Sequence, residues 1–89
     1  MLEKKIEITN KLGLHVRAAT KLVQAASLFD VDVTIAYNGQ TADAKSIMEV
    51  LMLAAVFGST VTLKVSGEEE GRVISQISAL FENRFGEKE

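Results

Sequence analysis

The pair Asn38-Gly39 lies between two stretches in which apolar and polar residues alternate, and it constrains the fold more than any other local feature. A tight primed turn requires positive φ at both central residues, and Asn followed by Gly tolerates that backbone well. The flanking segments, residues 31–36 and 40–44, are therefore expected to form a hairpin. Any sheet that this chain builds then contains at least one antiparallel pair.

The spacing of apolar residues assigns most of the remaining chain. Alternation over residues 2–9 and 60–65 predicts two strands, each with one buried face. A helical repeat predicts one helix from Val16 to residue 27 or 28, a second after Ser46 and a third after an acidic turn at 67–71. The residues expected to be buried by the three helices are Val16, Ala19, Leu22, Val23 and Ala26; then Ile47, Val50, Leu51 and Ala54; and finally Val73, Ile74, Ile77, Leu80 and Phe81.

The resulting order is β-α-β-β-α-β-α. Gly58 is a candidate stop for the second helix, with Phe57-Gly58 either at its end or just beyond it. Arg84 lies near the end of the third helix, and residues 86–89 are expected to form a frayed tail. Because each helix and each strand has one apolar face, we expect a single α+β domain over 1–89, with helices on one side of one sheet and solvent on the other.

Composition excludes several classes of function. The net charge of −2 and the single tyrosine argue against nucleic-acid binding. The absence of cysteine excludes disulfides and thiolate metal sites, and a single histidine leaves little for any other metal site. Residues 1–8 lack the apolar core of a signal peptide, and the longest apolar run, residues 50–57, is too short to span a bilayer. We therefore expect a cytoplasmic protein without membrane insertion and without a cofactor.

The one histidine, His15, stands in the segment Gly13-Leu14-His15-Val16-Arg17, between a predicted strand and a predicted helix. Free backbone N–H groups at a helix start favour negative charge. The same dipole disfavours imidazolium, and a neutral ring keeps the lone pair that phosphoryl transfer requires. Arg17 could compensate the charge of an added phosphate. The alternative is a packed or solvated histidine without chemistry, beside a solvated arginine.

The second helix carries two further features. Ser46 is an expected N-cap, and a phosphate on it would face free N–H groups, with Lys45 beside it as a possible partner. Ile47 and Leu51 fit the core, whereas Met48 and Met52 lie partly off the buried stripe and could form an exposed apolar patch. The triad Glu68-Glu69-Glu70 suits the start of the third helix, where acidic residues complement the dipole.

In combination, these segments resemble the HPr family, the histidine-containing phosphocarriers of the bacterial phosphoenolpyruvate-dependent sugar phosphotransferase system. Residues 13–17 look like the active-site signature of that family, and Tyr37-Asn38-Gly39 falls where its hairpin lies. The segment Lys45-Ser46-Ile47-Met48 looks like its regulatory serine motif. The motifs occur in the family's order along essentially the whole chain, which makes the resemblance far more specific than any one of them.

The resemblance implies an open-faced β-sandwich, in which three helices cover one face of a four-stranded antiparallel sheet. It implies a phosphoryl carrier rather than an enzyme: His15, through Nδ1, would accept phosphate from enzyme I and pass it to a sugar-specific enzyme IIA. Arg17 would stabilise the phosphoryl group, and Ser46 would be the target of HPr kinase/phosphorylase. The carrier would act as a monomer, and its partners would dock on the following residues: Val16, Thr20, Ile47, Met48, Leu51 and Met52.

Two positions depart from the family pattern. Proline normally follows the arginine, but here Ala18 does, and the chain contains no proline. Alanine restores a backbone donor near the phosphate, so transfer should survive, while the first helical turn loses a few tenths to about 1 kcal/mol of stabilisation. Glu49, near Ser46, would either repel a phosphate there or complete a capping box.

Three other functions stay open at this point. Ala18 and Glu49 are compatible with a mainly regulatory paralogue that acts through Ser46 or in a nitrogen-related phosphorelay. The β-α-β-β-α-β order also fits a small ligand-sensing or interaction module without covalent chemistry. RNA binding on the open face of the sheet is disfavoured, because the strands lack an aromatic and basic pattern.

Overall fold

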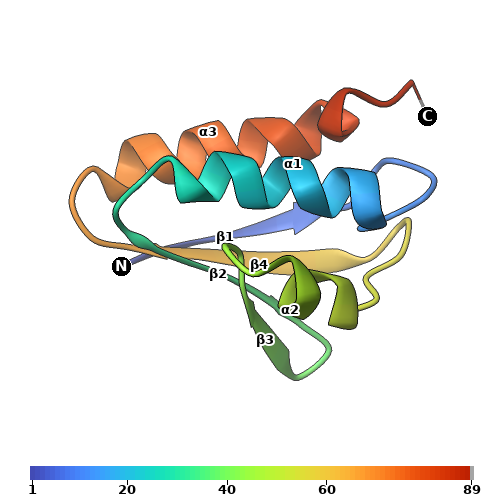
Figure 1. The fold of residues 1–89 in the computed structure, drawn as a ribbon, viewed down its shortest axis with the longest axis horizontal. Coiled ribbons are helices and arrows are strands. Elements are labelled where there is room, and N and C mark those ends of the chain that lie inside the picture. The colour runs from blue at the N-terminus through green and yellow to red at the C-terminus, as the bar shows by residue number, and fades with distance from the viewer. Residues whose placement is uncertain (89) are drawn as a thin grey trace.

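The computed structural model describes residues 1–88 and contains one antiparallel sheet with the strand order β1-β4-β2-β3 (Figure 1). Its strands are β1 (Leu2–Glu7), β2 (Asp32–Tyr37), β3 (Gln40–Asp43) and β4 (Thr60–Ser66). Strand β4 pairs with β1 along one edge and with β2 along the other. The expected antiparallel sheet is confirmed, and β4, one of its two interior strands, comes after the other three in the sequence.

The hairpin predicted at Asn38-Gly39 is present. Tyr37 pairs with Gln40, so the turn has two residues, and φ is 52° at Asn38 and 81° at Gly39. Positive φ at both central positions is the requirement of a type I′ turn. This turn fixes the register in which Ile35 faces Ala42, and both of these side chains are buried.

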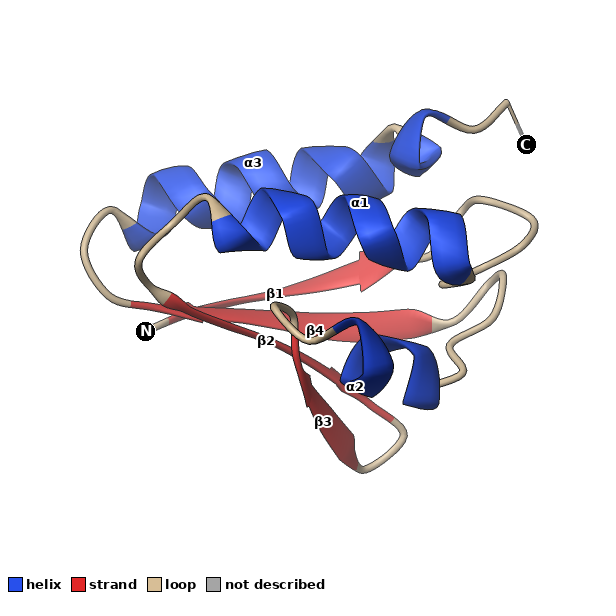
Figure 2. Cartoon of the chain, viewed as in Figure 1, coloured by secondary structure: helices blue, strands red, loops and turns tan. Residues whose placement is uncertain are grey.

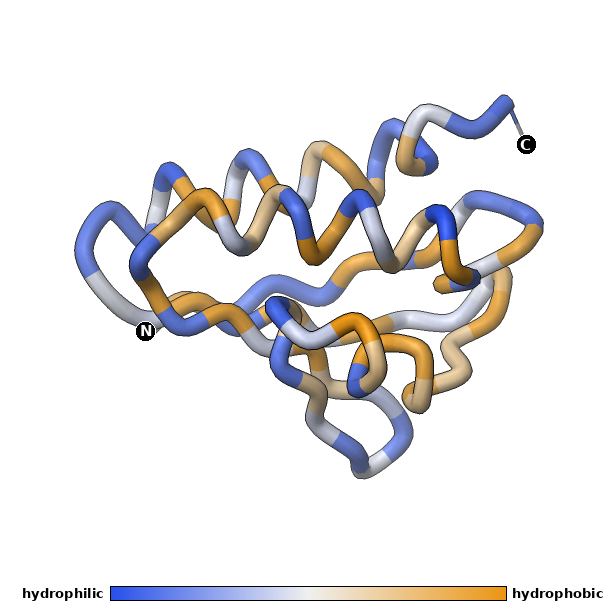
Figure 3. The backbone as a smooth tube through the Cα atoms, in the orientation of Figure 1, coloured by the Kyte–Doolittle hydropathy of each residue, from blue (hydrophilic) through white to orange (hydrophobic). Residues whose placement is uncertain are grey.

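Two long helices cover one face of the sheet, as Figure 2 shows. They are α1 (Val16–Ser27) and α3 (Glu70–Glu82), and they lie side by side, whereas the short α2 (Ile47–Met52) packs against α1 and β3. Hydrophobic and hydrophilic residues alternate along α1 and α3 in Figure 3. The apolar stripes of the helices meet the inward side chains of the strands, chiefly Val33, Ile35, Val61, Leu63 and Val65.

The buried face of α1 differs from the prediction at its first residue. Val16 is 62% exposed, and the buried stripe consists of Ala18, Ala19, Leu22 and Ala26. Val16 lies at the edge of that stripe, in the first turn of the helix. A valine at that position is therefore available to a partner and contributes little to the core.

Helix α2 also ends earlier than its apolar pattern suggested. It stops at Met52, and Ala54 adopts φ 53°, a left-handed backbone that ends the helix and turns its side chain to solvent. Leu53 and Ala55 are buried in place of Ala54. Gly58 lies beyond the helix, in the turn before β4, with φ 86°. Because an alanine rather than a glycine makes the left-handed turn, position 54 carries no recognisable stop signal.

The loop before α1 is held against the segment after α2 by a close backbone approach at Gly13. The amide of Leu14 donates to the carbonyl of Ala55 at 3.0 Å. Gly13 has φ 66°, and a Cβ built on it would lie 2.6 Å from the oxygen of Ala55 and 2.9 Å from Cα of Val56. Only glycine allows this contact, which places His15 beside the end of α2.

Gly13→Ala should therefore lower the free energy of unfolding by about 3 kcal/mol or more, because it combines left-handed backbone strain with a clash against backbone atoms. Gly58→Ala is the matched control: its φ is 86°, but no atom lies within 4 Å of the added Cβ. That variant should lose only about 1 kcal/mol. Chemical denaturation of both variants measures the difference, and equal losses would show that the approach at Gly13 is unimportant.

Candidate functional site

His15 is the N-cap residue of α1, as its place in the sequence suggested. Its backbone is extended, with φ −83° and ψ −178°, and its carbonyl accepts the first helical hydrogen bond from Ala19 at 2.8 Å. Its side chain does not cap the helix. Within residues 1–88 the amide of Arg17 has no hydrogen-bond acceptor, so this donor remains available to an anion, whereas Ala18 is completely buried.

The imidazole of His15 is held by a residue that the sequence analysis assigned to a frayed tail. Nε2 of His15 contacts Oε2 of Glu87, and Oε1 of Glu87 accepts a hydrogen bond from Nδ2 of Asn10 at 3.0 Å. The side chain of Glu87 is only 9% exposed, and that of His15 is 26% exposed. The prediction of fraying is therefore wrong for residues 86–88, while Glu89 lies outside the described residues.

A short helical turn folds the end of the chain back toward His15. Residues Arg84–Gly86 form a 3₁₀ turn in which all three residues have positive φ. Phe85 is buried and packs edge-on against Phe81, with the ring centroids 4.8 Å apart. Its carbonyl accepts a hydrogen bond from Nζ of Lys21 at 2.5 Å. A phenylalanine within an otherwise charged tail was the sequence signal that could have revealed this anchor.

Positive charge surrounds the contact between His15 and Glu87. A pocket of about 550 Å³ is lined by Lys11, Arg17, Lys21 and Lys88, together with Leu12, Gly86 and Glu87. Burial raises the pKa of Glu87, but hydrogen bonds from Asn10 and His15, and the charges of His15 and Arg17, outweigh burial and hold the pKa of Glu87 below its ordinary value. The carboxylate is therefore ionised at neutral pH.

Ser46 caps α2 as expected, but the charged side chains of Glu49 and Lys45 do not make the contacts that were expected. Its Oγ accepts from the amide of Glu49 at 3.4 Å. The carboxylate of Glu49 accepts from the amide of Asp43 at 3.0 Å, so the capping box is not completed. Lys45 donates to the carbonyl of Phe29 at 2.8 Å and is not directed at Ser46.

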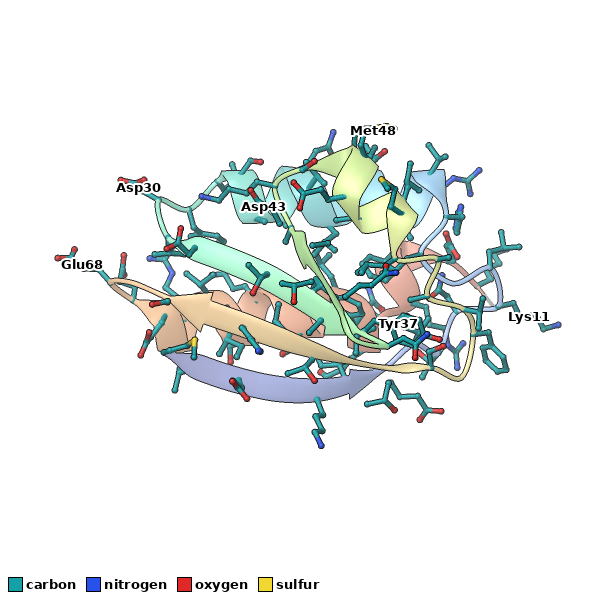
Figure 4. The ribbon with its side chains drawn as sticks, turned by 90° about the horizontal axis from the view of Figure 1, so that it is seen from below. Lys11, Asp30, Tyr37, Asp43, Met48 and Glu68 are labelled. Atoms are coloured by element: carbon teal, nitrogen blue, oxygen red, sulfur yellow. The ribbon has the colours of Figure 1, made fainter. Side chains whose placement is uncertain are left out.

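The predicted docking residues divide into two groups. Val16, Met48 and Met52 are each more than 60% exposed, whereas Thr20, Ile47 and Leu51 are partly buried. Met48 projects from the outer surface of α2 in Figure 4, which also shows Lys11 at the end of the molecule opposite Asp30 and Glu68. Three further exposed apolar residues lie on the loops near His15 and were not predicted from the sequence, namely Leu12, Val56 and Phe57.

Residues 1–88 contain no cluster of three or more His, Cys, Asp or Glu side chains arranged to hold a metal ion. No helix in this part of the chain has the length and apolar content needed to cross a bilayer.

Fold and site together define an open-faced β-sandwich that presents a histidine at the start of its first helix. The family model of the PTS HPr component phosphorylation site matches residues 2–83. The chain is 52% identical to phosphocarrier protein HPr of Cupriavidus necator, with both chains covered completely. It is 47% identical to HPr of Xylella fastidiosa, with 98% of each chain covered.

A solved structure of HPr from Thermoanaerobacter tengcongensis is similar to this one over the whole of both chains. The TM-score is 0.95 and the sequence identity is 38%. The chain therefore belongs to the HPr family of phosphotransferase-system phosphocarriers, which carry phosphate rather than catalyse a reaction of their own. Among the functions that the sequence left open, this family membership favours the carrier over the interaction module.

Two other similarities concern assembly and role. A structure described as an HPr dimer from Thermoanaerobacter tengcongensis has a TM-score of 0.78 and 39% identity, and covers 98% of this chain and 100% of its own. The phosphocarrier protein NPr of Shewanella violacea is 43% identical, with 97% of this chain and 94% of that protein covered. The proteins that are similar to this chain thus include one that forms a dimer, and they also include a carrier named NPr.

The lowered pKa of Glu87 gives a stability that depends on pH. The unfolded chain binds a proton at this carboxyl near the ordinary glutamate value of about 4.3, whereas the folded chain binds it only at lower pH. This contribution is present above the unfolded pKa and is lost as the pH falls through the folded pKa. Glu87→Gln should therefore reduce the loss in unfolding free energy between about pH 5.5 and about pH 2.5.

Denaturant unfolding at the two pH values measures this loss in the wild-type chain and the variant. Glu82→Gln serves as the control, because it removes a carboxylate that is 64% exposed and pairs with Lys4 at 3.4 Å on the surface. An equal reduction in both variants would mean that the contact with His15 contributes nothing specific.

Proposed function

We propose that His15 is the phosphoryl acceptor of this carrier and that Nδ1 forms the bond to phosphorus. The observation that carries the proposal is the position of His15 at the N-cap of α1, where the amide of Arg17 has no acceptor within residues 1–88. A phosphoryl group on the ring would lie near this donor and near the positive end of the helix dipole. The helix dipole then stabilises the dianion that transfer creates.

Arg17 supplies the mobile positive charge at this site. Its side chain is exposed, lines the basic pocket, and forms no hydrogen bond with the residues that the structure describes. A guanidinium can bind two phosphate oxygens at once. Ala18 stands where the family normally has proline, and the first turn loses some rigidity; because Ala18 is completely buried, its N–H does not add an exposed donor for the phosphoryl group.

The donor of the phosphoryl group is enzyme I and the acceptor is a sugar-specific enzyme IIA, the partners that the family implies. Residues 1–89 act as one phosphocarrier domain in the cytoplasm. A monomer suits this role best, since the same face must meet successive partners. Because dimers occur among the similar structures, the oligomeric state of this chain should be measured by sedimentation at assay concentration.

Incubation with enzyme I and phosphoenolpyruvate should yield an acid-labile, base-stable phosphoprotein with a phosphohistidine signal in 31P NMR. His15→Ala should abolish incorporation, and Arg17→Ala should slow it by about tenfold to a hundredfold, because a charge that stabilises the transferred group is lost. Unchanged incorporation in His15→Ala would overturn the assignment. Absence of transfer from the phosphorylated chain to a sugar enzyme IIA would instead favour a regulatory paralogue.

The exposed methionines of α2, Val16 and the partly buried Thr20, Ile47 and Leu51 form the docking patch for these partners. The approach of Gly13 to residues 55–57 keeps this patch beside His15. Ser46 lies at its edge and is the candidate site for HPr kinase/phosphorylase. A phosphate there would add negative charge next to Asp43 and Glu49, at the rim of an apolar surface.

Met48→Ala and Met52→Ala should each weaken binding of enzyme I by about fivefold to tenfold, as expected for exposed apolar contacts at an interface. Ser46→Asp should weaken it as well, because it places a charge at the edge of the patch. Leu28→Ala is the matched control, since Leu28 is 82% exposed at the opposite end of α1. Calorimetric titration measures the four affinities, and an equal loss in Leu28→Ala would refute the location of the patch.

A further inference from the structure

Glu87 is held in place from several sides, which distinguishes it from a surface carboxylate that meets a histidine by chance. One of its oxygens contacts Nε2 of His15 and the other accepts from Asn10, whose Nδ2 also donates to the carbonyl of Gly13 at 2.8 Å. Asn10 is completely buried. The buried ring of Phe85 anchors the turn just before Glu87. The carboxylate is thus fixed relative to the loop that carries His15.

The ionised state of Glu87 determines the proton on the facing nitrogen. The charged groups around it are His15, Arg17 and Lys21 of α1, Lys11 of the preceding loop, and Lys88 of its own segment. All of them are cations or can become cations, and this favours the carboxylate. A carboxylate only accepts hydrogen bonds, so Nε2 must carry the proton in this contact. In the neutral ring the lone pair then lies on Nδ1.

We propose that Glu87 is a positioning residue for phosphoryl transfer: it accepts the Nε2–H of His15, holds the ring with its Nδ1 lone pair exposed, and offsets the positive charge that the ring gains when Nδ1 bonds to phosphorus. This inference rests on the carrier function proposed above and adds a residue to it. Acidic groups that orient a histidine through its second nitrogen act in the same way in other sites.

The bonds and charges balance without any further reactant. The lone pair of Nδ1 forms the N–P bond, while the bond from phosphorus to its donor atom breaks and leaves its electron pair on the donor. The proton stays on Nε2, so the phosphorylated ring carries a positive charge beside the carboxylate of Glu87. In onward transfer the N–P electron pair returns to Nδ1. The leaving group is then a neutral imidazole, because Nε2 has kept its proton throughout.

Two variants of Glu87 separate its role in orienting the ring of His15 from the effect of its negative charge. Glu87→Ala removes both the acceptor and the charge, whereas Glu87→Gln retains an oxygen that can accept the Nε2–H but carries no charge. In 1H–15N spectra of the unphosphorylated wild-type chain, we expect a His15 Nε2–H signal that is protected from exchange with water. This signal should disappear in Glu87→Ala and persist in Glu87→Gln. Amide spectra of both variants verify that the fold is retained.

The rate of phosphoryl acceptance from enzyme I is the second measurement. It should fall by about tenfold in Glu87→Ala, as is usual when the partner that orients a functional histidine is removed. Glu87→Gln should also be slower than wild type at neutral pH. A merely structural role would leave both the Nε2–H signal and the rate of the folded variants at the wild-type level. Glu82→Gln should transfer at the wild-type rate.

The outcomes distinguish this proposal from the carrier function. If the wild-type chain takes up phosphate and Glu87→Ala matches it in both the Nε2–H signal and the rate, the role of Glu87 is overturned and the carrier function stands. If the wild-type chain takes up no phosphate, the carrier function fails and the role of Glu87 fails with it. Equal slowing in Glu82→Gln would assign the effect to net charge and also overturn the proposal.

Discussion

The pairing of β4 with both β1 and β2 is the constraint on which the rest of the structure depends. Strand β4 comes after two helices and three strands in the sequence, yet it occupies the interior of the sheet. Its inward residues, Val61, Leu63 and Val65, are completely buried beneath the helices. Without this strand, β1 has no neighbour and the β2–β3 hairpin stands alone. A two-stranded hairpin by itself is at best marginally stable in water.

Two backbone features then convert the sheet into a site. The close approach at Gly13 joins the loop of His15 to the segment after α2, so the reactive ring is tied to the helix that carries the exposed Met48 and Met52. The turn at Arg84–Gly86 brings an acidic side chain to the same ring from the far end of the sequence. Several cations surround that single carboxylate. An incoming dianion therefore enters a site whose fixed charge is positive on balance.

The parts of the fold that local sequence patterns could predict are those determined by short-range physics. The Asn38-Gly39 turn, the alternation in β2 and β4 and the stripe of α3 each follow from backbone preference or from periodic burial. The position of His15 at a helix start could be predicted because the spacing of apolar residues changes from alternating to helical at Val16. The order of the motifs along the chain resembles that of the HPr family, and this resemblance predicted the antiparallel sheet.

The features that could not be predicted depend on contacts between distant residues, or on backbone conformations that are unusual for the residue type. Glu87 and His15 are 72 positions apart, and no local pattern connects them. Ala54, Arg84 and Phe85 adopt left-handed backbone although none is glycine, so the residue type does not reveal these turns. Lys45 looked like a partner for Ser46, but its side chain reaches the carbonyl of Phe29. These backbone conformations and side-chain contacts are determined by tertiary structure.

The two ends of the described chain differ in how they relate to the reactive histidine. The amino group of Met1 pairs with Glu70 at the start of α3, whereas the segment ending at Lys88 runs past His15 at the other end of the molecule (Figure 1). A reporter or affinity tag joined ahead of Met1 would project away from the site and leave it accessible. The same tag joined to the other end would be attached within a few residues of Glu87, whose carboxylate contacts the imidazole, and would compete with a protein that docks there. The two ends of the chain are therefore not equivalent as points of attachment for a label.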